Sequence, residues 1–148
     1  MKQWPEFDER GDLPIGIHQA ILADVIEHFG SGTTQRRIVA QRLIRIYYLA
    51  NSTGHVARFI IYGSFVTAKP SPNDVDIFLL MEDGFDKSRT SGETATLFEH
   101  LTAEDDIGAS IFWMRRLSIL GSEQELIEHW QTKRGKTRRG IVEVINRD

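Results

Sequence analysis

Cysteine is absent from this 148-residue chain, and proline occurs only four times. Without cysteine there is no disulfide bond, no thiolate zinc site and no cysteine nucleophile, so a bound metal would need oxygen or imidazole ligands. Long apolar runs are also missing, and no stretch approaches the ~20 consecutive apolar residues of a membrane helix. Because the first residues, Met1–Glu6, lack the apolar core of a signal peptide, we expect a cytoplasmic protein with no membrane partner.

Charge of one sign does not dominate either. The net charge is -3, and 41% hydrophobic with 26% charged residues is a composition typical of globular proteins. A chain of this length suits one domain, so we predict a single domain over residues 1–148. Turn residues are dense in residues 1–16, which we expect to form an extended arm held to the body by Trp4, Phe7 and Leu13.

Apolar residues at helical spacing predict two amphipathic helices in the first third of the chain. The first begins at Ile17 and ends before Gly30, and the second follows Thr33 or Thr34 and ends near Asn51. Four arginines lie opposite the apolar side of the second helix. We interpret them as a solvated face in preference to a nucleic-acid surface: Arg36, Arg37, Arg42 and Arg45.

Short apolar runs in the rest of the chain predict strands. Helical spacing predicts a helix over 94–101, broken by the acidic residues and glycine of 104–108, and another helix starting at Ser122. Together these elements predict an α/β (α+β) fold with a mixed sheet backed by helices. The expected strands lie near 58–62, 74–81, 109–114 and 140–145.

The most informative stretch runs from Ile60 to Met81. Asp74 and Asp76 stand two residues apart at the start of a strand, so both carboxylates lie on one face, where a divalent cation such as Mg2+ or Mn2+ would relieve their repulsion. Gly63 lets the backbone approach an anion, and Ser64 opens a short helix that can bind phosphate. Lys69 in the connecting loop either reaches a phosphate or is an exposed lysine.

These residues carry a resemblance to a known superfamily. An apolar run with Gly63 and Ser64, nine residues, and then Asp74 and Asp76 resembles the signature of the DNA polymerase beta-like nucleotidyltransferases. The N-terminal arm, this core and the closing Lys-Thr-Arg-Arg-Gly-Ile-Val-Glu segment are also similar to a small uncharacterised prokaryotic family of nucleotidyltransferase-like proteins. The resemblance implies a minimal nucleotidyltransferase fold and nucleotidyl transfer from a nucleoside triphosphate, with two metal ions held by three carboxylates.

The third carboxylate is where the chain departs from that pattern. In the superfamily it comes from a later strand, and Ser110 occupies the expected position on 109–114. Asp105 and Asp106 just before that strand are the alternatives. The basic segment 133–139 would bind either a nucleic-acid acceptor or the triphosphate, or would be a solvated loop.

Two functional hypotheses from different classes follow. The first is a metal-dependent nucleotidyltransferase that uses Asp74 and Asp76 for metal and Gly63, Ser64 and Lys69 for phosphate, with a protein, nucleic-acid or small-molecule hydroxyl as acceptor. The second is a catalytically inactive nucleotide- or partner-binding module, for example in a toxin-antitoxin or phage-defence pair, which Ser110 favours. The nucleotide, the acceptor and the oligomeric state, a homo-oligomer included, stay open.

Overall fold

A mixed five-stranded sheet organises the computed structural model, which describes residues 2–132 and 137–146, with backbone only at 101, 102, 105 and 106. The strand order is β1-β5-β2-β3-β4. The outer pairs β1/β5 and β3/β4 are parallel, and the two inner pairs are antiparallel. The predicted α+β class, a mixed sheet backed by helices, is confirmed. The strands are β1 (Ile17–Ala20), β2 (Val56–Tyr62), β3 (Val75–Met81), β4 (Ala109–Arg115) and β5 (Ile141–Val144).

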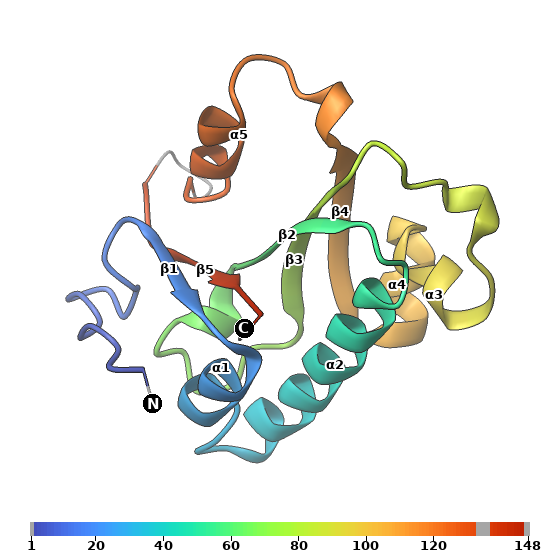
Figure 1. Ribbon diagram of the computed structural model, residues 1–148. Coiled ribbons are helices and arrows are strands. Elements are labelled where there is room, and N and C mark those ends of the chain that lie inside the picture. The colour runs from blue at the N-terminus through green and yellow to red at the C-terminus, as the bar shows by residue number, and fades with distance from the viewer. Residues whose placement is uncertain (1, 133–136, 147–148) are drawn as a thin grey trace.

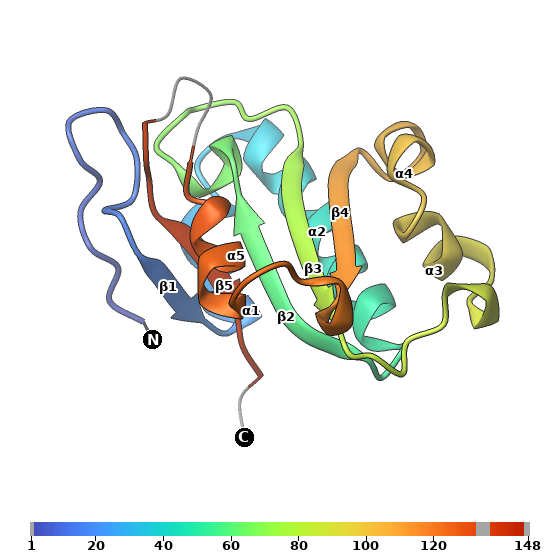
Figure 2. The same ribbon diagram turned by 90° about the horizontal axis from the view of Figure 1, so that it is seen from above.

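Helices lie on both faces of the sheet. In Figure 1, α1 (Leu22–Phe29) and α2 (Thr34–Asn51) lie below it and α5 (Glu123–His129) lies above it. Figure 2 shows α3 (Gly92–Leu97) and α4 (His100–Ile107) beside β4 at one edge. The described residues also form three short 3-10 helices: η1 (Ser64–Val66), η2 (Lys87–Arg89) and η3 (Arg116–Ser118).

Alternate residues of β3 face two separate apolar clusters. Ile77 and Leu79 belong to the larger cluster with α1 and α2, whereas Phe78 and Leu80 pack in the smaller one with Ile127 of α5. Side chains along a strand alternate between faces, so Asp76 shares the α5 face of the sheet with Phe78. The polar start of β3 thus lies on the more lightly covered side (Figure 2).

The N-terminal arm is held to the body as predicted. Leu13 is fully buried, and the Trp4 and Phe7 rings contact the Phe29 ring with centroids 5.0 and 6.2 Å apart. Among residues 2–16 the backbone forms neither helix nor strand, apart from one bridge that pairs Asp12 with Thr67.

The prediction of one helix from Ile17 to Phe29 is wrong for its first part. Residues Ile17–Ala20 form β1, which pairs with β5 at the far end of the chain, and the helix begins only at Leu22. The apolar spacing of Ile17 and Ile21 mimics a helical face, and the true start has no side-chain cap to mark it. Pairing with a distant strand overrides the local pattern.

The predicted helix over 94–101 is also corrected. The chain forms two helices there, and α4 continues through the acidic residues that we expected to break it. It is held by the buried side chains of Ala103 and Ile107, and it ends at Gly108, whose φ of 74° is left-handed. The expected helix after Ser122 and the four expected strands are confirmed.

Candidate functional site

The turn between β2 and η1 places a glycine against a carboxylate. Gly63 has φ 82° and ψ -167°, a conformation that glycine adopts easily and other residues rarely do. A Cβ atom added there would lie 2.0 Å from Oδ2 of Asp76. The two halves of the motif therefore touch through the one residue without a side chain. Ser64 then opens η1, as predicted.

Three polar side chains stand side by side across three strands. In the strand register Tyr62 lies opposite Asp76, and Asp76 lies opposite Ser110. Directly opposed residues project from the same face of a sheet. Ser110 hydrogen-bonds the Tyr62 hydroxyl, and burial together with the charge of Asp76 raises the pKa of Tyr62. Ser110, on the strand where the sequence analysis expected the third carboxylate, therefore stands beside Asp76.

The environment disfavours the negative charge of both aspartates. Burial first, and then the charge of Asp74, raises the pKa of Asp76 to about 6. Burial and the Glu104 carboxylate raise the pKa of Asp74, against the opposing charges of Arg42 and Lys69. Neighbouring carboxylates with raised pKa values are typical of sites that a cation completes. Sequence reasoning missed Glu104, which α4 brings within electrostatic range of the pair.

Arg36 organises the loop that joins the two motif halves. Its guanidinium donates to the carbonyl oxygens of Phe29 at 3.0 Å, Phe65 at 2.8 Å and Thr67 at 2.6 Å, and also to that of Lys69. The side chain is buried, with 7% of the residue exposed. Four carbonyl acceptors satisfy this buried cation, which in turn fixes the path of the chain after η1.

The prediction that four arginines of α2 face solvent is therefore wrong in two cases. Arg36 is buried, and the half-buried Arg42 donates to the carbonyl of Asn73 at 3.3 Å. Its guanidinium fills the space beside Gly108, where a Cβ atom would lie 2.8 Å from it. Arg37 and Arg45 are exposed as predicted. A helical pattern does not show which polar residues a folded-back loop will cover.

A cavity of about 450 Å³ opens next to the motif. Ser64, Thr67 and Lys69 line one side, and Arg10 and Asp12 of the arm line another. Arg139, just before β5, completes the wall and pairs with Asp12 at 3.3 Å. From the sequence, phosphate binding was one of two alternatives for Lys69 and one of three for the segment that contains Arg139. The sequence analysis missed Arg10 and Asp12 because they lie in the arm.

Other candidate ligands lie outside the cavity or outside the described residues. Asp106 belongs to α4, but its side chain lies outside the described part, as do Lys133, Arg134 and Lys136 of the basic segment. Among the side chains that the structure describes, which leave out those of Asp105 and Asp106, no three from His, Asp or Glu are grouped so as to hold a metal ion. Asp74 and Asp76 are thus a two-carboxylate donor set, which suits one oxygen-preferring ion.

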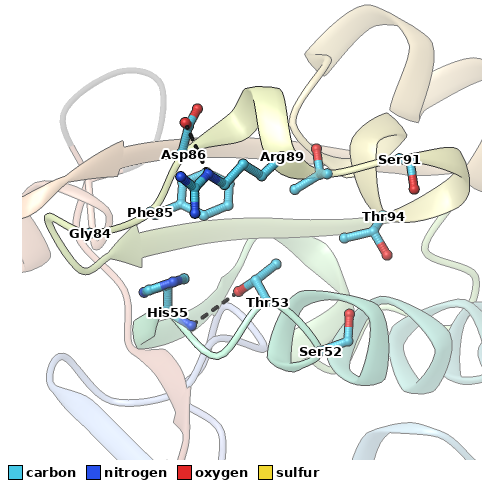
Figure 3. A pocket seen from close by; sticks show the side chains of 10 residues that line it. Ser52, Thr53, His55, Gly84, Phe85, Asp86, Arg89, Ser91 and Thr94 are labelled. Atoms are coloured by element: carbon cyan, nitrogen blue, oxygen red, sulfur yellow. Dashed lines mark hydrogen bonds and ion pairs between the residues drawn. The ribbon is translucent and has the colours of Figure 1, made fainter.

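A second cavity, of about 370 Å³, lies at the opposite end of the β2–β3 hairpin (Figure 3). Its walls carry hydroxyl groups, His55, and the ion pair of Asp86 with Arg89 at 3.7 Å. No residue of the Gly-Ser or Asp-x-Asp pattern lines it. The cavity beside Ser64 is therefore the candidate functional site.

The chain belongs to a protein family of unknown function, DUF6932, whose pattern it matches over residues 5–145. No curated protein and no solved structure matches the chain. Within the described residues, none of the helices has the length and apolar character needed to cross a membrane.

Proposed function

We propose that this DUF6932 protein is a metal-dependent nucleotidyltransferase, which moves a nucleoside monophosphate from a nucleoside triphosphate to a hydroxyl group of a protein, nucleic acid or small molecule. One observation carries the proposal: the Asp76 carboxylate lies against Gly63, at the point where Ser64 opens η1. A cation-binding carboxylate and a phosphate-binding turn are thereby joined. This is the arrangement that the resemblance to the DNA polymerase beta-like superfamily implies.

In such a transfer the acceptor hydroxyl releases its proton to solvent, and its oxygen forms a bond to the α-phosphorus. The bond from that phosphorus to the oxygen bridging the β-phosphorus breaks, and pyrophosphate leaves. Asp74 and Asp76 would hold Mg2+ or Mn2+, which when bound supplies positive charge to the reacting phosphate. The Ser64 hydroxyl donates to a phosphate oxygen, and Lys69 offsets phosphate charge. Arg36 keeps this loop in place through its carbonyl contacts.

Ser110 favours a second candidate function. It stands in register with Asp76, where the superfamily has its third carboxylate, and its hydroxyl cannot supply the missing negative charge. A site with two carboxylates would bind a nucleotide with one metal ion more easily than it would hold the two ions needed for catalysis. The alternative is therefore a catalytically silent nucleotide- or partner-binding module, for example one half of a toxin-antitoxin or phage-defence pair.

Transfer of label separates the two functions. The purified protein is incubated with each of the four ribonucleoside triphosphates, labelled at the α-phosphate, plus Mg2+ or Mn2+ and a cell lysate. The transferase reading predicts label in an acceptor, and loss of that label in Asp74→Asn and Asp76→Asn. Glu27→Gln, which neutralises an exposed carboxylate on α1, serves as the control. Absence of label in every acceptor, the protein itself included, would leave the silent module as the function.

A further inference from the structure

The cavity beside Ser64 concentrates positive charge in a chain whose net charge is -3. Its lining holds three cationic side chains, Arg10, Lys69 and Arg139, against the single carboxylate of Asp12. In the described part of the chain, neither Arg10 nor Lys69 lies within ion-pair distance of a carboxylate, and the charge of Lys69 acts at longer range on Asp74. A concave surface with excess positive charge attracts multiply charged anions.

Backbone contacts fix the walls of this cavity relative to one another. The Ala68 amide donates to the Gly11 carbonyl at 2.8 Å, and the Gly140 amide donates to the Leu13 carbonyl at 2.9 Å. Gly140 lies so close to the arm that a Cβ atom would stand 2.2 Å from the Pro14 carbonyl oxygen. The arm, the motif loop and the approach to β5 therefore form one preorganised cradle, and ligand binding need not order them.

The cradle adjoins the reacting end of the proposed site. Ser64 lines the cavity, while the preceding residue, Gly63, touches the carboxylate of Asp76. Arg139 also lies close enough to Asp76 to lower its pKa in part, against the effect of burial. An extended anion held in the cavity would thus have one end beside the two aspartates.

Resting on the proposed nucleotidyltransferase function, we infer that this cradle binds the β- and γ-phosphates of a nucleoside triphosphate, and that Arg10 of the arm and Arg139 make the site selective for triphosphates. The α-phosphate then lies toward Asp74 and Asp76. The nucleoside and a monophosphate alone would leave the cradle unfilled. A nucleic-acid backbone spaces single phosphates along a strand, so it matches three cations clustered around one cavity less well than a polyphosphate tail does.

Calorimetric titration of the full chain tests this inference. The probes are ATP, ADP, AMP and inorganic tripolyphosphate, each with Mn2+, and a single-stranded oligonucleotide with a 5′-hydroxyl. We expect ATP to bind more tightly than ADP, ADP more tightly than AMP, and tripolyphosphate to compete with ATP. Arg10→Gln and Arg139→Gln should each weaken ATP binding about tenfold and leave AMP binding unchanged. Arg37→Gln is the matched control, because Arg37 is an exposed arginine of α2 whose guanidinium hydrogen-bonds Thr34.

Two variants guard against a folding artefact. Arg139 pairs with the buried Asp12, so Arg139→Gln is checked by its unfolding temperature, whereas Arg10 is exposed and Arg10→Gln should unfold as the natural chain does.

Equal ATP affinity in the natural chain and Arg10→Gln, or competition by the oligonucleotide as strong as that of tripolyphosphate, would overturn the inference. Arginine-dependent ATP binding without label transfer would uphold it and reject only the transferase function. Label transfer with unchanged ATP affinity in both arginine variants would support the transferase function and overturn the inference about the two arginines.

Discussion

At the scale of single residues, Gly63 is the point where the two halves of the motif meet. Its backbone has a positive φ, and the Asp76 carboxylate occupies the space that a Cβ atom would need. Gly32 has a comparable φ of 98°, but nothing lies within 4 Å of its added Cβ. An added side chain at Gly32 would therefore cost backbone strain alone, whereas one at Gly63 would also clash with Asp76.

Replacing each of these glycines by alanine measures that difference. Gly32→Ala should lower the free energy of unfolding by about 1 kcal/mol, the cost of a non-glycine residue in this conformation. Gly63→Ala should cost at least twice as much, about 2–4 kcal/mol, because the carboxylate of Asp76 must also move. Urea unfolding monitored by tryptophan fluorescence gives both values. Equal losses in the two variants would contradict the close packing of Gly63 on Asp76.

The raised pKa of Asp76 predicts a pH-dependent stability. Because the folded-state pKa of about 6 exceeds the ordinary value of 3.8, the folded state holds a proton that the unfolded state has released between those pH values. The metal-free protein therefore loses stability as the pH rises through that window. Asp76→Asn removes the loss and should gain about 1–2 kcal/mol over the natural chain at pH 7.5.

Urea unfolding of both proteins with EDTA, at pH 4.5 and 7.5, measures this gain. The advantage of Asp76→Asn should be smaller at the lower pH, where the natural aspartate is largely protonated in the folded state. An advantage that does not change with pH would show that the carboxylate titrates normally.

Ser110 offers a gain-of-function test. An aspartate there would project beside Asp76 from the neighbouring strand and supply a third carboxylate. Ser110→Asp should bind Mn2+ at least about tenfold more tightly than the natural chain and should be less stable without metal, since a like charge is added. Ser110→Asn, of similar shape without the charge, is the control. Calorimetric Mn2+ titration that finds no difference between the two variants would place Ser110 away from the ion.

At the scale of secondary-structure elements, the strongest link between a helix and the site is Arg36 of α2. Its four carbonyl contacts connect α2 to the end of α1, to η1 and to the loop after η1. Lysine keeps the charge but cannot span these acceptors as a planar guanidinium does.

Arg36→Lys and Arg36→Met should both lower the free energy of unfolding, by about 3 kcal/mol or more for Met, since buried carbonyl groups lose their donor. Arg37→Met on the exposed side should stay within about 0.5 kcal/mol of the natural chain. Chemical denaturation supplies the comparison. A loss no larger for Arg36→Met than for Arg37→Met would contradict the buried carbonyl contacts.

The elements also show which patterns a sequence reveals. Thr33 accepts a hydrogen bond from the Arg36 amide and Ser122 accepts one from the Glu125 amide, so both helices start at a readable cap. The start of α1 has no such cap, and β1 depends on pairing with a strand from the other end of the chain. Local signals predicted the capped helices and the strands β2, β3, β4 and β5, and they missed the edge strand β1.

At the scale of the whole molecule, the site depends on contacts between distant parts of the chain. The motif residues Gly63, Ser64, Asp74 and Asp76 were predictable because a short loop joins them. The cavity was not, since Arg10 and Arg139 come from opposite ends of the chain and meet through the arm and the approach to β5. Buried Arg36 was hidden for a related reason, because its partners become neighbours only in the folded state.

The central claim is that Asp74 and Asp76 hold a divalent cation beside a nucleoside triphosphate bound at Gly63 and Ser64. Calorimetric titration with the preferred triphosphate tests it most directly. The titration is done in Mn2+ and in EDTA, on the natural chain and on the double variant that carries both Asp74→Asn and Asp76→Asn. We predict binding in Mn2+ that weakens at least about tenfold, or ~1.4 kcal/mol, in EDTA and in the double variant. Triphosphate affinity that is the same with and without the metal and the two carboxylates would contradict the claim.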